Sequence, residues 1–243
     1  MSPYRRADAL VVGIGLLLLL AWDNSGLDLR AAHWFGNAQG FAWRENWLLS
    51  GVLHTGGRWL GLTVVGGLAI ALVWPARRVS PFGLQLGRQP GMRLGMRLGL
   101  SRGQRAWWLL ATLACALLVP GIKQLTMTSC PWDLAEFGGT ARYISHWRFG
   151  LQDGGGGHCF PSGHATSAFA LLSGWFVLRG PHPQAARIWL VVVVLMGLIF
   201  GAAQLMRGAH YPSHTLWTAW LCWTLCAGLA HWLPRSQLQA AGP

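Results

Sequence analysis

Hydrophobic residues form six long runs along the chain, and shorter segments rich in polar and charged residues separate them. A helix that crosses the hydrocarbon layer of a membrane needs about 20 mostly apolar residues. Its backbone polar groups must be hydrogen-bonded within the segment, so each run is predicted to be a helix. The predicted spans, which borrow flanking residues where a run is short, are 9–22, 59–74, 106–122, 165–178, 188–206 and 215–233.

The composition of the chain agrees with a membrane environment. Hydrophobic residues make up 53% of its 243 residues and charged residues only 11%, whereas charged residues are roughly 25% of an average soluble protein. A net charge of +12 would also suit a nucleic-acid-binding protein. Here, however, the charges lie between apolar runs instead of covering one polar face. The sequence therefore predicts membrane lipids, and no nucleic acid, as partners.

We predict an all-α fold, an integral membrane bundle of six transmembrane helices that forms a single membrane domain over residues 1–243. The first run also has features of a secretory signal peptide, because Arg5 and Arg6 precede it. No small-residue cleavage site follows, so a retained span is favoured. The segment 23–58 mixes apolar, aromatic and charged residues and is predicted to be an interfacial helix on the outer leaflet. His54 within it is interpreted as an interface residue.

Basic residues are distributed unequally between the two sides of the predicted bundle. With the N-terminus inside, the inner segments hold most of the arginines and one acidic residue, Asp8, whereas the two signs nearly balance outside. Cytoplasmic segments carry an excess of basic residues, so both termini are predicted to be cytoplasmic in a bacterial inner membrane. The segment 75–105 is basic with no acidic residue. It either contacts anionic lipid headgroups or only sets the topology.

Three polar clusters fall on the predicted outer, periplasmic side of the bundle. The first runs from Lys123 through TMTSCPWD, the second is HCFPSGH at 158–164, and the third is QLMRGAHYPSH at 204–214. About one membrane crossing separates each cluster from the next, so all three can meet at one depth. This convergence defines the candidate site.

The first two clusters suit the binding of an anion. Lys123 is the only lysine of the chain, and an ammonium group serves phosphate as a point charge, although a lysine at a span end can also snorkel. Ser162 and Gly163 precede a predicted helix, whose free amide groups would form an anion site. His164 could donate a proton to a leaving group. Simple capping by Ser162 is the alternative interpretation.

His210 and His214 of the third cluster are four residues apart, so they can share one face of a helix or turn. A histidine beside an anion site can attack phosphorus if a neighbour orients its second ring nitrogen. The pair could instead bind a metal with His164 or His158 as third ligand. No carboxylate-bearing ligand set accompanies it, so chemistry without a metal or cofactor is favoured. An interfacial pair without chemistry stays open.

Lys123 with SCPWD, PSGH at 161–164 and RGAHYPSH at 207–214 resemble the three signature motifs of the type 2 phosphatidic acid phosphatase family. The resemblance covers about residues 106–233. It implies a six-helix membrane bundle that hydrolyses phosphate esters without a metal. It further implies that His210 attacks phosphorus to form a phosphohistidine and that His164 protonates the leaving oxygen. Lys123, with Ser162 and Gly163, would hold the phosphoryl oxygens.

The chain departs from the family pattern at three positions. Arginines are expected where Cys130 and Gln204 stand, and an aspartate is expected where His214 stands. Arg207, one helical turn from Gln204, is the candidate replacement for a guanidinium in the substrate site. Either His214 or Asp133 would orient His210, and the sequence leaves this choice open.

Cys130 and Cys159 are the only cysteines on the predicted outer side, and each lies beside a motif. The outer face of a bacterial inner membrane permits disulfides. We therefore predict a bridge that ties the first two motif segments together, with two free thiols as the alternative. Cys115, Cys222 and Cys226 fall within spans and are interpreted as buried packing residues.

These features together predict a membrane lipid phosphatase that removes phosphate from a lipid phosphate monoester or diphosphate at the periplasmic face. The alternatives are a lipid phosphotransferase on the same scaffold and a non-catalytic protein that binds or transports a lipid headgroup. The sequence does not identify the lipid or the oligomeric state.

Overall fold

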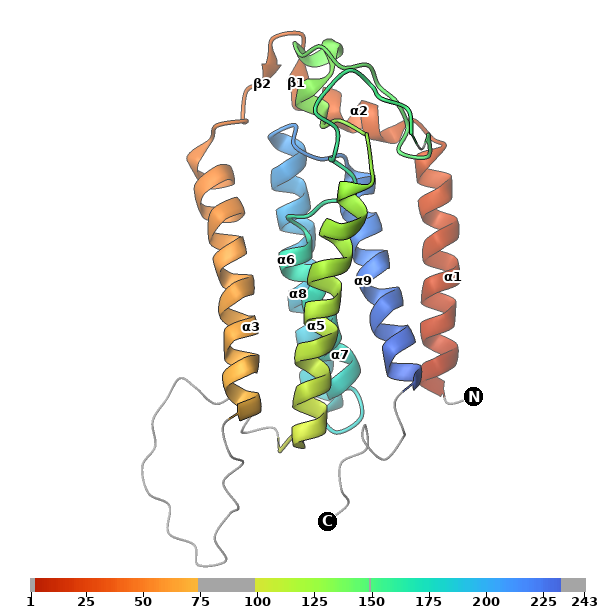
Figure 1. Cartoon of the computed structure of the whole chain (residues 1–243), viewed down its shortest axis with the longest axis vertical. Helices are drawn as coiled ribbons and strands as arrows, with labels where there is room; N and C mark the ends of the chain where they lie inside the picture. The colour runs from red at the N-terminus through yellow and green to blue at the C-terminus, as the bar shows by residue number, and fades with distance from the viewer. Residues whose placement is uncertain (1–2, 74–98, 149, 233–243) are drawn as a thin grey trace, which may run out of the picture.

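The computed structural model describes residues 3–73, 99–148 and 150–232, and most of this chain is helical. Figure 1 shows the long helices running along the longest axis of the molecule. They are α1 (Pro3–Asp23), α3 (Gly57–Val73), α5 (Arg102–Gln124), α8 (Pro183–Met206) and α9 (Pro212–Trp232). Helix α9 packs against α1, α5 and α8, and α3 packs against α5.

Shorter elements complete the bundle and cover one of its ends. Between α1 and α3 lie α2 (Leu27–His33), the antiparallel pair β1 (Gly36–Asn37) and β2 (Gly40–Phe41), and the π-helix η1 (Leu48–Gly56). The 3₁₀ turns η2 (Pro131–Asp133) and η3 (Ala135–Phe137) follow α5. Before α8, the chain forms α6 (Thr166–Phe169), η4 (Ala170–Leu172) and α7 (Ser173–Leu178).

Each predicted hydrophobic run lies in a helix as far as the chain is described, but the count of six membrane spans is not confirmed. Within the described residues, three helices are long and apolar enough to cross a membrane: Leu48–Val73, Arg102–Gln124 and Pro183–Met206. A fourth span results if α1 and α2, which are bent by 64° at their junction, are counted together. The helix Thr166–Leu178 is shorter than a full span, and α9 is not among the helices that are apolar enough. The chain is nevertheless that of a membrane protein, because several of its helices are strongly apolar.

The second helical span begins earlier than the sequence predicts. Its first turns are the π-helix η1, and the side chain of Asn46 accepts hydrogen bonds from the backbone N–H groups of Leu48 (3.0 Å) and Leu49 (3.2 Å). This capping starts the helix at Leu48. The predicted interfacial helix over 23–58 is therefore wrong as a single element. His54 is part of a helix that enters the bundle.

The main core lies where α5, the α6–α7 segment, α8 and α9 meet. Helix α5 begins at a capping box, in which Ser101 and Gln104 bond each other's backbone N–H groups (3.2 and 2.8 Å). Deeper in the bundle, the Thr112 hydroxyl lies 2.7 Å from that of Ser173 and joins α5 to α7. This packing sets the position of the end of α5, which carries Lys123.

The end of the bundle where α1 starts and α9 stops is joined by a buried ion pair. Arg179 donates two hydrogen bonds to the carboxylate of Asp8, each 2.8 Å long, and the His231 imidazole lies 3.7 Å from the same carboxylate. The contact joins α1 to α9 and to Arg179, the residue that follows α7. The basic segment predicted over 75–105 lies mostly outside the described residues.

Candidate active site

The three polar clusters meet at the end of the bundle that α2, the β1–β2 pair and the turns after α5 cover (Figure 1). Backbone hydrogen bonds hold the clusters together. The N–H of His158 donates to the carbonyl of Thr126 (3.0 Å), and the N–H of Ser162 donates to that of His214 (3.1 Å). The backbone N–H of Trp132 donates to the carbonyl of Gly208 (2.9 Å). The convergence is therefore built into the backbone.

A covalent bond adds to these contacts. Cys130 and Cys159 form a disulfide, and the backbone N–H of Cys159 donates to the Thr128 carbonyl (2.8 Å). The Thr126 hydroxyl bonds the carbonyl of Phe160 (2.7 Å). The first two motif segments are thus tied at several points beside the third.

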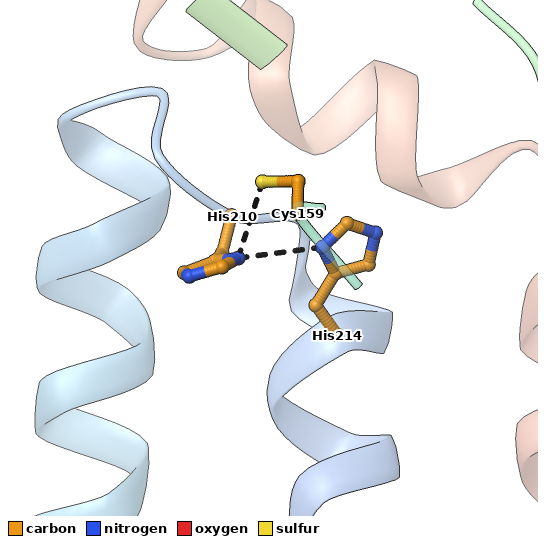
Figure 2. A group of neighbouring side chains, drawn as sticks. All are labelled: Cys159, His210 and His214. Carbon is orange, nitrogen blue, oxygen red and sulfur yellow. Dashed lines mark hydrogen bonds between the residues drawn. The ribbon is translucent and has the colours of Figure 1, made fainter. Parts of the chain in front are cut away.

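His210 and His214 form a buried imidazole pair, with relative exposures of 5% and 1%. Their Nδ1 atoms are 3.4 Å apart, and the sulfur of Cys159 lies 3.5 Å from Nδ1 of His210 (Figure 2). A disulfide sulfur has no proton, so its contact with the ring is one of packing. If the proton between the rings is on His210, Nε2 on the far side of that ring keeps its lone pair.

The environment of His210 favours the neutral ring. Burial lowers the pKa of His210 to about 3, and the positive charge of Lys123 acts in the same direction. The imidazole is therefore unprotonated at neutral pH, which is the form that can act as a nucleophile.

The structure brings His214 to His210, and it does not bring Asp133 there. The Asp133 carboxylate accepts a hydrogen bond from the backbone N–H of Cys130 (3.3 Å) within the η2 turn. The prediction that left Asp133 as an orienting group is therefore wrong in this geometry, because the 3₁₀ turn directs that carboxylate to its own backbone. The imidazole of His214 stands where the family pattern has an aspartate.

His164 is held by two contacts from η1. Its Nε2 lies 3.2 Å from the carbonyl oxygen of Leu53. Its ring is stacked on that of His54, with centroids 4.4 Å apart and planes inclined by 23°. Burial, together with the neighbouring imidazole of His54, lowers the pKa of His164 to about 4. His54 is thus part of the site, which the sequence interpretation missed; a single histidine in an apolar segment carries no signal that distinguishes it.

Lys123 lies beside the PSGH segment. A Cβ atom added to Gly163 would be 3.8 Å from the Lys123 ammonium nitrogen, so glycine leaves space there. No described residue accepts a hydrogen bond from this ammonium. Lys123 is therefore available to a bound anion.

Ser162 has a structural role that differs from the predicted one. Ser162 is fully buried, and its hydroxyl accepts a hydrogen bond from the backbone N–H of Ala165 (3.4 Å). Its own backbone N–H donates to the carbonyl oxygen of His214. The helix begins only at Thr166 with the short α6. The predicted anion site at a helix terminus is therefore not formed through the Ser162 amide. Ser162 is not the N-cap of α6 either, because that position is Ala165 and no side chain caps the helix.

Gln204 and Arg207 lie next to each other at the end of α8. The Gln204 side chain is buried, its oxygen accepts a hydrogen bond from Arg207 (3.5 Å), and its amide nitrogen bonds no described residue. Arg207 also donates to the Arg44 carbonyl (2.9 Å). Its positive charge contributes to the lowered pKa of His164. A buried donor without a partner is rare and marks a place for a ligand oxygen or water.

The site therefore gathers positive charge and hydrogen-bond donors around a buried imidazole. Within the described residues, no carboxylate bonds Lys123, His164 or His210. An anion at this point would neutralise the ammonium and take the free amide hydrogens of Gln204. The arrangement suits a phosphoryl group, whose transfer depends on such surrounding positive charge.

These features define the class as an α-helical membrane protein with a cluster of imidazole, ammonium and guanidinium groups at one end of its bundle. A family model, that of the PAP2 superfamily, matches residues 105–238, more than half of the chain. The protein belongs to this superfamily, in agreement with the resemblance in its motifs. No curated protein and no solved structure matches the chain. Members of the superfamily are generally phosphatases, so the match supports a phosphatase-like function.

Proposed function

We propose that the protein is a membrane lipid phosphatase that hydrolyses a lipid phosphate monoester or diphosphate without a metal. The observation that carries the proposal is the buried His210–His214 pair beside the ammonium of Lys123, which bonds no acceptor among the described residues. It supplies a neutral nucleophile and a charge for the phosphoryl oxygens within one site. The apolar helices favour a substrate with acyl or prenyl chains, because withdrawing each methylene from hydrocarbon costs about 0.8 kcal/mol.

In the proposed first step, Nε2 of His210 attacks phosphorus, and the bond from phosphorus to the leaving oxygen breaks. His214 orients the ring through Nδ1 and shares its proton as positive charge develops. Lys123 and Arg207, with Gly163 leaving space and Gln204 donating its free amide hydrogen, hold the phosphoryl oxygens.

His164 supplies the proton for the leaving oxygen. Because Nε2 of this ring faces the Leu53 carbonyl, Nδ1 is the nitrogen that carries the transferred proton. A bound phosphate dianion raises the pKa of a nearby imidazole, so the proton is present on Nδ1 when the substrate is bound. Water then attacks the phosphohistidine and releases inorganic phosphate, and His164 accepts a proton from that water.

We further propose a bundle of six spans in a bacterial inner membrane, with both termini in the cytoplasm and the site at the periplasmic face. The unequal distribution of arginine supports this orientation. The site lies at the end of the bundle opposite to the start of α1 and the end of α9, which agrees with this orientation (Figure 1). Cysteine-accessibility labelling of Arg235→Cys and Trp34→Cys in intact cells tests the assignment.

Release of inorganic phosphate tests the activity itself. The purified protein in detergent is offered phosphatidylglycerol phosphate, polyprenyl diphosphate, phosphatidate and lipid A phosphates, with chelator present. We expect release from at least one lipid and its loss in His210→Gln, while His33→Gln, an exposed histidine paired with Glu136, keeps the activity. Phosphate transferred to a second lipid would identify a phosphotransferase. Binding without turnover by the parent protein would contradict the proposal.

A further inference from the structure

We propose that reduction of the Cys130–Cys159 disulfide creates a zinc-type metal site formed by Cys159, His210 and His214. The sulfur and one ring nitrogen of each histidine lie within 4.8 Å of one another (Figure 2). Thiolate and imidazole are the ligands that zinc prefers in proteins. All three residues are buried, so a bound ion would be shielded from solvent.

The spacing of the three atoms is close to that of a tetrahedral zinc site. Zinc–nitrogen and zinc–sulfur distances of about 2.0 and 2.3 Å place neighbouring ligand atoms about 3.3–3.6 Å apart. The two nitrogens are 3.4 Å apart, and the sulfur is 3.5 Å from Nδ1 of His210. A small rotation of the His214 ring toward the sulfur would complete three ligands, and a water molecule would be the fourth.

The disulfide prevents this site from forming in the oxidised protein. The metal ligand is the thiolate, and the Cys159 sulfur in a disulfide carries no negative charge. The oxidised chain therefore offers only two imidazoles, which is fewer than the three protein ligands of catalytic zinc sites.

Reduction is a two-electron step that needs an external dithiol or phosphine. With a dithiol, its two thiols become a disulfide, while the protein disulfide takes up two electrons and two protons and becomes two thiols. The metal ion then displaces the thiol proton of Cys159, which goes to solvent. The backbone bonds from Cys159 to Thr128 and from Ser162 to His214 do not depend on the disulfide. They keep the three ligands together after reduction.

The effect on activity rests on the proposed function. A metal on Nδ1 of His210 leaves the ring proton on Nε2, so that nitrogen has no lone pair for attack on phosphorus. The reduced, metal-loaded protein would therefore be inactive, and the oxidised protein would be insensitive to zinc. The disulfide then acts as a redox control of the phosphatase site.

Cobalt binding tests the site independently of activity. The full-length protein in detergent is reduced with a phosphine, freed of reductant under anaerobic conditions and titrated with Co²⁺, which reports thiolate ligation by absorption. We expect equimolar binding with a cobalt–thiolate band after reduction and none in the oxidised protein. Cys130→Ser frees the Cys159 thiol without reduction, so this variant should bind without any reductant.

Cys159→Ser is the matched control, since it also lacks the disulfide but has no thiol at the site. It should lose the cobalt–thiolate band. This loss would show that Cys159 supplies the thiolate, and not one of the three core cysteines Cys115, Cys222 and Cys226. Absence of the band in both the reduced protein and folded Cys130→Ser, checked by circular dichroism, would overturn the proposal. Retention of the band in Cys159→Ser would also overturn it. If cobalt binds but no lipid phosphate is hydrolysed, the proposed function fails while the metal site stands.

Discussion

The imidazole rings of His54 and His164 are stacked, with centroids 4.4 Å apart and planes inclined by 23°. The same π-helix supplies the Leu53 carbonyl that faces Nε2 of His164. π-Helical turns are rare and occur frequently at functional sites. The η1 segment therefore fixes the orientation of the proposed proton donor from two sides, and His54 is a positioning residue.

The first prediction concerns this stack. His54→Ala leaves the His164 ring without its support and should lower kcat for phosphate release by about tenfold. His54→Phe keeps an aromatic ring against His164 and should retain most of the turnover. It should move the alkaline limb of the pH profile to higher pH, because His164 must be protonated to act as the acid and the variant lacks the imidazole that helps to lower the pKa of His164. Equal loss in both variants, with no change in the pH profile, would contradict the positioning role.

A second prediction concerns the guanidinium of Arg207. Arg207→Ala should lower kcat/KM by about 100-fold, since a charge-assisted contact to the phosphoryl group contributes about 2–3 kcal/mol. Arg207→Lys should recover part of this loss because the charge is kept. Arg142→Ala, which changes an exposed arginine after the η3 turn, is the control and should be neutral. Steady-state kinetics on the best lipid of the panel measure the effect, and a neutral Arg207→Ala would remove this residue from the site.

The third prediction concerns Asp28 in α2. Its buried carboxylate accepts hydrogen bonds from the Ser213 N–H (3.0 Å), the Ser213 hydroxyl and the Trp22 indole (2.8 Å). It thereby caps the start of α9, next to His210 and His214. Asp28→Ala leaves these buried donors unpaired and should lower the free energy of unfolding by about 2–4 kcal/mol. Glu45→Ala, at an exposed carboxylate, is the control and should leave the thermal midpoint unchanged. An Asp28→Ala variant with the same thermal midpoint as the parent protein would refute the capping role.

The fourth prediction is a loss of stability in acid. The pKa values of His210 and His164 are held near 3 and 4 by burial, against about 6.5 in an unfolded chain. At a pH between the folded and unfolded pKa values, the unfolded state binds more protons than the folded state. The contribution of the two neutral histidines to stability is therefore complete above about pH 6.5 and declines as the pH falls toward 4. The thermal midpoint in detergent should fall over this range. His210→Gln should weaken the dependence relative to His33→Gln, and an unchanged slope would contradict the buried neutral imidazole.

The sequence by itself determined the helical character of the chain and the identity of its chemical groups. The apolar runs report a preference that each segment has locally, because a backbone in lipid must bond within its own helix. The motif residues Lys123, His164 and His210 were also found from the sequence, because their residue types and spacing carry the chemistry of phosphate. The family match over residues 105–238 agrees with those motifs.

Only the tertiary structure decided which of these groups touch one another. Whether His214 or Asp133 reaches His210 depends on a 3₁₀ turn that directs the Asp133 carboxylate to the Cys130 backbone. The role of His54 depends on a π-helix that begins at Leu48 and on the packing of η1 against α8. Contacts of this kind join residues far apart in the chain and depend on the rotation and depth of each helix. Hydrophobic periodicity does not specify either quantity, because it reports which residues avoid water and not which side chains they meet.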